Sequence, residues 1–107
     1  MSNLTIKTET PDEQLTVIKL LGIFEGMTAI ESEAQLLEIV KNTGTPQLWV
    51  DFAEIVYIDS AAVGILITTA KAAIAKNIHF MIWRPNVNVK KVLTVTHVDR
   101  LIPIIDE

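Results

Sequence analysis

The feature that most constrains the fold is an alternation between short apolar runs and longer segments with helical spacing. The runs at 47–52 (QLWVDF) and 78–83 (IHFMIW) have the length of buried strands and are bounded by turn residues. Between them, from Ser60 to Asn77, apolar residues recur at the spacing of one helix face. A strand, a helix and a second strand in this order predict a β–α–β unit, and hence an α/β domain.

Further strands and helices complete the expected architecture. The segment 4–10 alternates apolar and polar residues, and 11–13 (PDE) is typical of a turn, so we expect a hairpin whose second strand ends near 22–26. A helix from Thr28 precedes the strand at 47–52. After residue 83 we expect a turn at 84–86, a helix around 89–96, a helical turn at 98–101 and an edge strand at 102–105. The expected order is ββαβαβαβ: one domain over 1–107, with a mixed sheet of four to five strands packed by three to four helices.

Local signals predict where two helices begin and end. Thr28 and Glu31 have the capping-box spacing, and Gly44 is expected to end that helix as a left-handed cap. Asp59 is expected to cap the second helix, and Asn77 to end it in the left-handed region. The residues expected to face the core are Ile30, Ala34, Leu37 and Val40 on the first helix and Val63, Ile67, Ala70 and Ile74 on the second.

Two apolar features leave alternatives open. Trp49 and Trp83 lie on strands expected to be buried, so we expect core positions. One of them could instead be a partly exposed anchor for a partner, because aromatic residues are enriched at interfaces. The stretch 61–67 is apolar on nearly every side, which fits either deep packing or an exposed docking patch.

Composition excludes several classes of function. Thirteen acidic residues against nine basic ones give a net charge of −4, the wrong sign for a protein that binds nucleic acid through phosphate contacts. The chain has no cysteine and two histidines, which leaves no thiolate nucleophile and too few ligands for a typical zinc site. Residues 1–7 are polar, and the longest uncharged apolar stretch, 61–70, is about half of a membrane span. We therefore expect a cytoplasmic protein without membrane contact, cofactor or metal.

The segment with the most chemical information is the junction at Asp59 and Ser60, where an extended apolar run meets an alanine-rich helix. The Asp59 carboxylate can accept from free amides of the first turn, which leaves Ser60 at the helix start with its hydroxyl near the surface. A phosphate on Ser60 would lie at the positive end of the helix dipole and add a charge of about −1.5 to −2. On residue chemistry alone, an ordinary helix start explains the same dipeptide.

Other site chemistries have less support. Ser60 lies in no Gly-x-Ser-x-Gly elbow, and no motif links it to His79 or His97, so we do not expect a serine hydrolase. The glycines form no phosphate-binding loop, so the chain itself is not expected to bind ATP. Three carboxylates lie close together in the sequence: Asp51, Glu54 and Asp59. They could suggest a site for a hard metal ion, but a polar strand end and a helix cap explain them better.

The junction lies within a longer string, 56–66 (VYIDSAAVGIL), which resembles the signature of STAS-domain anti-sigma factor antagonists. That signature typically reads apolar-apolar-Asp-Ser-Ser/Ala-Gly-Leu-Gly and continues with aliphatic residues. Further matches follow the family's order at 20–22 (LLG), 49–52 (WVDF), 89–93 (VKKVL) and 96–99 (THVD). The resemblance extends over nearly the whole chain and implies a single STAS domain that is not an enzyme.

The resemblance also implies a function and a site. In the family, the serine directly after the aspartate is phosphorylated by a partner that is both a GHKL-type serine kinase and an anti-sigma factor. The unmodified antagonist binds this partner and frees the sigma factor, and a PP2C-type phosphatase restores it after phosphorylation. The serine corresponds to Ser60, and the partner-binding residues would be Glu25, Asp59, Ser60, Ala61, Ala62 and Gly64. A compact, acidic, cysteine-free domain gives no reason to expect more than a monomer when free.

The chain departs from the family pattern at several positions. Ala61 stands where a second serine is common, and Ala62 where glycine is usual. In the loop after Gly22, Ile23 replaces a polar residue and Glu25 stands where aspartate is frequent. The two alanines leave a second function open, a STAS module that acts as a constitutive scaffold or regulatory subunit of a stress-signalling or transporter complex without phosphorylation.

Overall fold

The elements follow one another in the order expected from the sequence. The structure, a computed structural model, describes residues 3–106. The elements are β1 (Leu4–Asp12), β2 (Leu15–Gly22), α1 (Gly26–Asn42), β3 (Gln47–Glu54), α2 (Ser60–Ala75), β4 (His79–Trp83), α3 (Val87–Val95), the short 3₁₀ helix η1 (Val98–Arg100) and β5 (Ile104–Ile105). The predicted order ββαβαβαβ is therefore confirmed.

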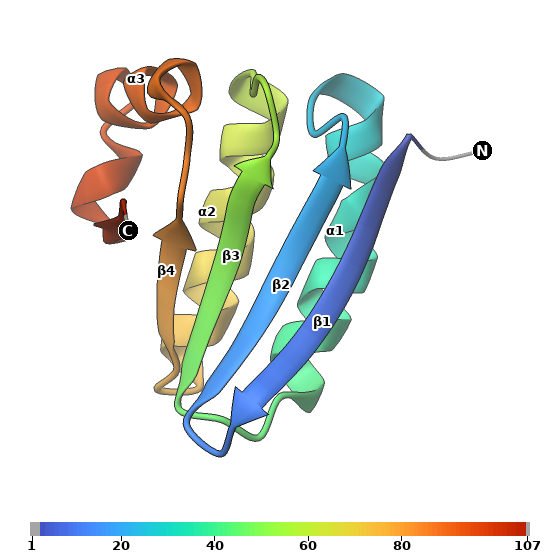
Figure 1. The fold of residues 1–107 in the computed structure, drawn as a ribbon, viewed down its shortest axis with the longest axis vertical. Coiled ribbons are helices and arrows are strands. Elements are labelled where there is room, and N and C mark those ends of the chain that lie inside the picture. Colours follow the sequence, from blue (N-terminus) through green and yellow to red (C-terminus); the bar gives the residue numbers. More distant parts are fainter. Residues whose placement is uncertain (1–2, 107) are drawn as a thin grey trace.

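The strands form one mixed sheet in which spatial order equals chain order. β1 and β2 are antiparallel, whereas β2, β3, β4 and β5 are parallel to one another. Crossovers between parallel strands are right-handed almost without exception. Because β2-α1-β3 and β3-α2-β4 advance across the sheet in the same direction, α1 and α2 lie on the same face (Figure 1).

The core lies between the sheet and the two long helices. Alternate residues of the central strands point into it, among them Ile18, Leu20, Leu48, Val50, Phe52 and Ile82. The helices contribute Ala29, Leu36, Val40, Leu66, Ala70 and Ala73. Phe24 packs its ring edge-on against Phe52, with ring centroids 5.9 Å apart. At roughly 25 cal/mol per Å² of buried apolar area, this layer is the main source of stability.

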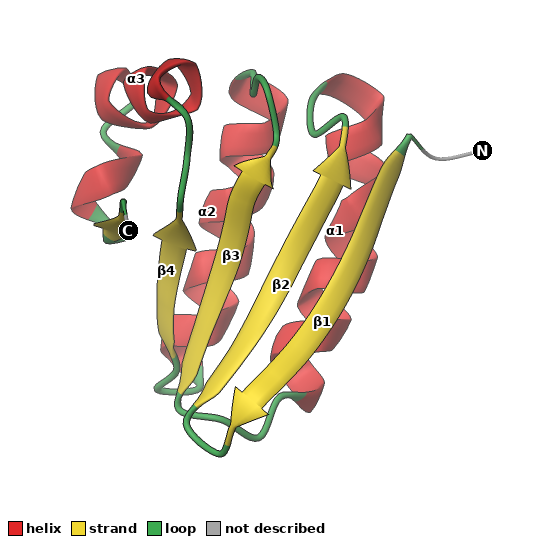
Figure 2. Cartoon of the chain, in the orientation of Figure 1, coloured by secondary structure: helices red, strands yellow, loops and turns green. Residues whose placement is uncertain are grey.

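Within residues 3–106, no helix lies on the other face of the sheet (Figure 2). Trp49 and Trp83 alternate along their strands with fully buried neighbours, so they point to this uncovered face. There they pack edge to face, with ring centroids 5.5 Å apart, and remain half-buried. The prediction of core positions for the two tryptophans is therefore wrong, because strand periodicity does not say whether the second face of a sheet is covered.

Helix α1 differs from the expectation in its start and in its phase. It begins at Gly26, so Thr28 lies inside the helix and is not its N-cap, and the predicted capping box of Thr28 and Glu31 is wrong. The residue in the N-cap position, Glu25, makes no side-chain cap hydrogen bond. Its buried residues are Ala29, Ser32, Leu36 and Val40. Ile30, expected in the core, is 50% exposed. Ser32 is accommodated on the buried face because its hydroxyl donates to the Ala29 carbonyl oxygen at 2.6 Å.

Several chain reversals also differ from the expectation. Helix α1 ends with an extended cap at Thr43, and Gly44 has no left-handed backbone. The sequence predicts a turn at 11–13, but β1 continues through Pro11 to Asp12, with a register shift between Glu9 and Asp12. β1 is an edge strand, and a bulge there tolerates proline because no backbone amide is needed for strand pairing at that position.

Helix α2 is buried along a broader face than the single stripe expected. Ala62, Leu66 and Ala73 are fully buried, whereas Ile74 is 50% exposed and Ile67 only half-buried. Small alanine side chains let the helix lie close to the sheet, so the larger side chains at the rim remain partly outside. Asn77 has the expected left-handed backbone, with φ of 60°.

A glycine at the end of β2 provides a test of this fold. Gly22 has φ of +115°, and a Cβ there would collide with the carbonyl oxygen of Asn3, which accepts from the Ile23 amide at 3.0 Å. We expect Gly22→Ala to lower the free energy of unfolding by about 2 kcal/mol or more through backbone strain and this collision. Urea unfolding followed by circular dichroism measures the loss.

The matched control is Gly44→Ala. Gly44 has no positive φ, and a Cβ there meets no atom within 4 Å. We expect this variant to be unchanged or up to about 1 kcal/mol more stable, because alanine reduces the freedom of the unfolded chain. Equal losses in the two variants would contradict the assigned role of Gly22.

Candidate functional site

Parallel strand order brings three loops to one edge of the sheet. β2, β3 and β4 all point to the edge at the top of Figure 1, although β4 ends lower than the other two. The loops that leave them, 23–25, 55–59 and 84–86, are called here the carboxyl-edge loops. Functional sites of α/β sheets usually form at this edge, because the loops and the helix N-termini converge there.

Ser60 lies on this edge as the first residue of α2, and its side chain is exposed. The preceding residue, Asp59, has an extended backbone, and its Oδ1 accepts from the Ala62 amide at 3.0 Å. The predicted cap of this helix is therefore confirmed. Within residues 3–106, no hydrogen bond engages the Ser60 hydroxyl. The oxygen is free to face a partner from solvent.

The second oxygen of Asp59 makes a contact that the sequence does not reveal. Its Oδ2 accepts from the backbone amide of Gly26 at 2.9 Å. Gly26 is the first residue of α1 and has φ of +54°, a left-handed conformation that glycine adopts without strain. One carboxylate thus joins the N-termini of α1 and α2. The sequence predicts only that the second strand ends near 22–26, and no local signal in it indicates this partner.

Asn86 makes a similar pair of contacts one loop further along. Its Oδ1 accepts from the Val89 amide at 2.7 Å and caps α3. Its Nδ2 donates to the carbonyl oxygens of Ile55 and Val56, at 3.2 and 2.9 Å. The three carboxyl-edge loops are therefore joined to one another by the cap side chains of α2 and α3.

Exposed apolar side chains lie near this junction on the first two loops and on the first turns of α1 and α3. Those at the carboxyl edge, called here the edge apolar residues, are Ile23 (46% exposed), Met27 (67%), Val56 (74%), Tyr57 (52%) and Val87 (83%). Apolar side chains gathered at one edge and left uncovered by the chain itself are typical of a protein-interaction surface.

The residues expected to bind a partner are not equally accessible. Ser60 and Gly64 are exposed, and Glu25, Asp59 and Ala61 are half-buried. Ala62 is fully buried, so its methyl group packs in the core instead of facing a partner. The stretch 61–67 is mostly buried, and the apolar surface comes from the loops and the adjoining first turns of α1 and α3.

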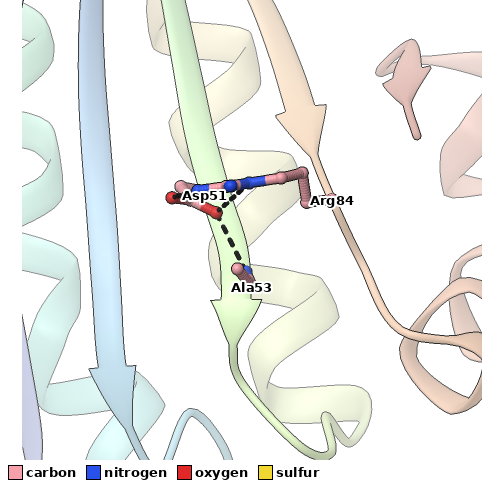
Figure 3. Close-up of polar contacts among 3 residues, drawn as sticks. All are labelled: Asp51, Ala53 and Arg84. Carbon is pink, nitrogen blue, oxygen red and sulfur yellow. Dashed lines mark hydrogen bonds and ion pairs between the residues drawn. The ribbon is translucent and has the colours of Figure 1, made fainter. Parts of the chain in front are cut away.

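Two of the three carboxylates considered as metal ligands have other roles: Asp59 caps α2, and Asp51 is paired with an arginine. Asp51 is 2% exposed and forms a two-point ion pair with Arg84, with Oδ2 2.6 Å from Nη2 and Oδ1 3.3 Å from Nε (Figure 3). Asp51 Oδ1 also accepts from the Ala53 amide at 2.9 Å (Figure 3). The hydrogen bond to Asp51 raises the pKa of Arg84, against the opposing effect of desolvation.

This ion pair shields the uncovered sheet face. The guanidinium also lies 3.9 Å from the ring centre of Trp83, so it covers both the carboxylate and an aromatic ring.

Among residues 3–106, no cluster of three or more histidine or acidic side chains could hold a metal ion. None of the helices in the described chain is long and apolar enough to cross a membrane.

The double role of Asp59 generates a stability prediction. Asp59→Ala removes the cap of α2 and leaves the amides of Ala62 and Gly26 without their acceptor. We expect a loss of about 1–2 kcal/mol in the free energy of unfolding, measured in urea. Ser60→Ala, one residue away and exposed, should change it by no more than about 0.5 kcal/mol. If Asp59→Ala left the free energy of unfolding unchanged, the two hydrogen bonds would contribute nothing to stability.

Three solved structures resemble this fold closely. An anti-sigma factor antagonist from Mycobacterium paratuberculosis aligns with a TM-score of 0.85 at 20% identity, covering 97% of this chain and 86% of that one. The Bacillus cell fate determinant SpoIIAA in its phosphorylated form aligns with a TM-score of 0.69 at 15% identity, covering 94% of this chain and 90% of that one. A variant of RsbS from Moorella thermoacetica aligns with a TM-score of 0.75 at 17% identity, covering 92% of this chain and 84% of that one. These similarities show a shared fold.

The family is shown by the sequence match itself. The family model of the STAS domain matches residues 5–107. This range includes all the described helices and strands except Leu4, the first residue of β1. The resemblance inferred from the Asp59–Ser60 junction and its ordered neighbours is confirmed by this match. The chain belongs to the STAS domain family.

Proposed function

We propose that this protein is an anti-sigma factor antagonist controlled by phosphorylation of Ser60. The unphosphorylated form binds an anti-sigma factor that is also a GHKL-type serine kinase, and so frees a sigma factor. Phosphorylation of Ser60 ends this binding, and a PP2C-type phosphatase restores it. The protein acts in the cytoplasm and is a monomer when free. Membership of the STAS family and the shared fold support this proposal.

The observation that carries the proposal is the position of Ser60. Its exposed hydroxyl lies at the first residue of α2, among the edge apolar residues. A kinase can reach the oxygen without unfolding the helix, and a phosphate there would lie at the exact surface that a partner must cover. Phosphorylation of this one residue would therefore change the charge of the binding surface directly.

The chemistry of the modification requires no group from this chain other than the hydroxyl. The Ser60 oxygen attacks the γ-phosphorus of ATP held by the partner kinase. A bond forms between Oγ and phosphorus while the bond from phosphorus to the β,γ-bridging oxygen breaks, and ADP leaves. The hydroxyl proton passes to a base of the kinase. The nucleotide therefore belongs to the partner's site.

The added charge explains the direction of the switch. Phosphate brings a charge of about −1.5 to −2 at pH 7 next to the Asp59 carboxylate. When a partner covers this surface, the dianion must lose water without gaining an opposite charge, and it repels acidic groups of the partner. A loss of about 3–4 kcal/mol in binding free energy corresponds to a change in affinity of two to three powers of ten.

The first prediction concerns the modification itself. Intact-mass spectrometry is run on wild type and on Ser60→Ala, before and after incubation with ATP and candidate GHKL-type serine kinases. We expect the mass of one phosphate on wild type and none on the variant. Complex formation without any gain in mass would favour the constitutive scaffold instead.

A second prediction concerns binding to the kinase identified in that experiment. Ser60→Glu should weaken the complex at least tenfold, because a carboxylate carries part of the phosphate charge, whereas Ser60→Ala should bind as wild type. The matched control is Thr68→Glu, an exposed position on α2 about 12 Å further along the helix. Isothermal titration calorimetry measures the affinities, and equal weakening by both glutamates would contradict a local role for Ser60.

A further inference from the structure

One carboxylate supplies the side-chain cap of two helices. Asp59 caps its own helix α2 through Oδ1 and the Ala62 amide, while its Oδ2 accepts from the Gly26 amide in the first turn of α1. The residue in the N-cap position of α1, Glu25, makes no side-chain hydrogen bond to that helix. Asp59 therefore replaces a local cap for α1, from a position 33 residues further along the chain.

The contact holds a segment that presents two of the edge apolar residues. Gly26 lies between Ile23 and Met27, which are 46% and 67% exposed. Its left-handed backbone, with φ of +54°, turns the chain from the loop into α1. The position of the Gly26 amide therefore bears directly on Met27, the next residue, whereas the Ile23 amide is also held by its own bond to the Asn3 carbonyl oxygen.

We infer that Asp59 is a positioning residue of the switch: its carboxylate holds the β2–α1 loop in place, and a phosphate on Ser60 releases that loop. The inference rests on the proposed function, since it concerns the effect of phosphorylation at Ser60. It adds to that function a second consequence of the phosphate, a change in the segment that carries Ile23 and Met27, besides the charge at the interface.

The physical reason is competition at the start of α2. A phosphate on Ser60 is a second anion directly beside the Asp59 carboxylate, and both are attracted to the positive N-terminus of α2. Repulsion between the two anions displaces the carboxylate. The bond to Gly26 is the more vulnerable of its two bonds, because it joins segments distant in sequence, whereas the bond to Ala62 lies within one helical turn.

A substitution can separate the two roles of Asp59. Serine is as good an N-cap as aspartate, so Asp59→Ser keeps an acceptor for the Ala62 amide. Its single, shorter oxygen leaves the Gly26 amide without a partner. We expect amide hydrogen exchange, measured by NMR, to become about tenfold faster at Gly26 and to change less than twofold at Ala62. Unchanged exchange at Gly26 would overturn the positioning role.

Asn86→Ser is the matched control. It keeps the cap on α3 but removes the amide that donates to Ile55 and Val56. This cap does not contact the β2–α1 loop, so exchange at Gly26 should remain within twofold of wild type. Equally fast exchange at Gly26 in this variant would show general loosening of the edge, and would overturn a specific role of Asp59.

The decisive experiment compares the unmodified chain with one in which phosphoserine is incorporated biosynthetically at position 60. We expect exchange at Gly26 about tenfold faster in the phosphorylated chain, with Ala62 still protected. If Gly26 is unchanged, the inference fails, even where phosphorylation abolishes partner binding. Because the phosphate is installed without a kinase, the result is independent of the mass-spectrometric test, in which failure to phosphorylate Ser60 would contradict the proposed function alone.

Discussion

The handedness of the two β–α–β crossovers is the constraint on which the rest of the structure depends. Since β2, β3 and β4 are neighbours in chain order, right-handed crossovers place α1 and α2 on one face of the sheet. The same arrangement brings three strand ends, three loops and the N-termini of three helices to one edge. In the part of the chain that the structure describes, no helix covers the opposite face, where the Asp51–Arg84 pair and two tryptophans pack against one another.

At the carboxyl edge, polar side chains do two tasks at once. Asp59 and Asn86 satisfy amides that a helix start leaves without partners, and each also reaches a neighbouring loop. Three loops of different origin therefore form one surface that presents exposed apolar side chains around Ser60. The proposed phosphate on Ser60 would lie at a helix N-terminus, where these loops are joined, and in that proposal one modification would act on the whole surface.

Prediction from the sequence succeeded where the signal is local and repeated. The element order, the cap at Asp59 and the left-handed Asn77 all follow from spacing and residue chemistry, and the structure confirms them. It failed where a contact from a distant segment overrides a local signal. Thr28 and Glu31 have the capping-box spacing, but α1 starts at Gly26, where Asp59 supplies an acceptor for the backbone amide. Packing against the rest of the core, and not the capping signal, places Ala29 and Leu36 on the buried face.

The sequence by itself determined the α/β architecture, the family and the position of Ser60 at a helix start, because hydrophobic period and capping chemistry act over a few residues. Only the tertiary structure decided which sheet face is covered, that Ala62 is buried, and that Asp59 also holds Gly26. These features depend on contacts between segments distant along the chain. Such contacts arise when crossovers bring strand ends together, and no spacing within one segment records them.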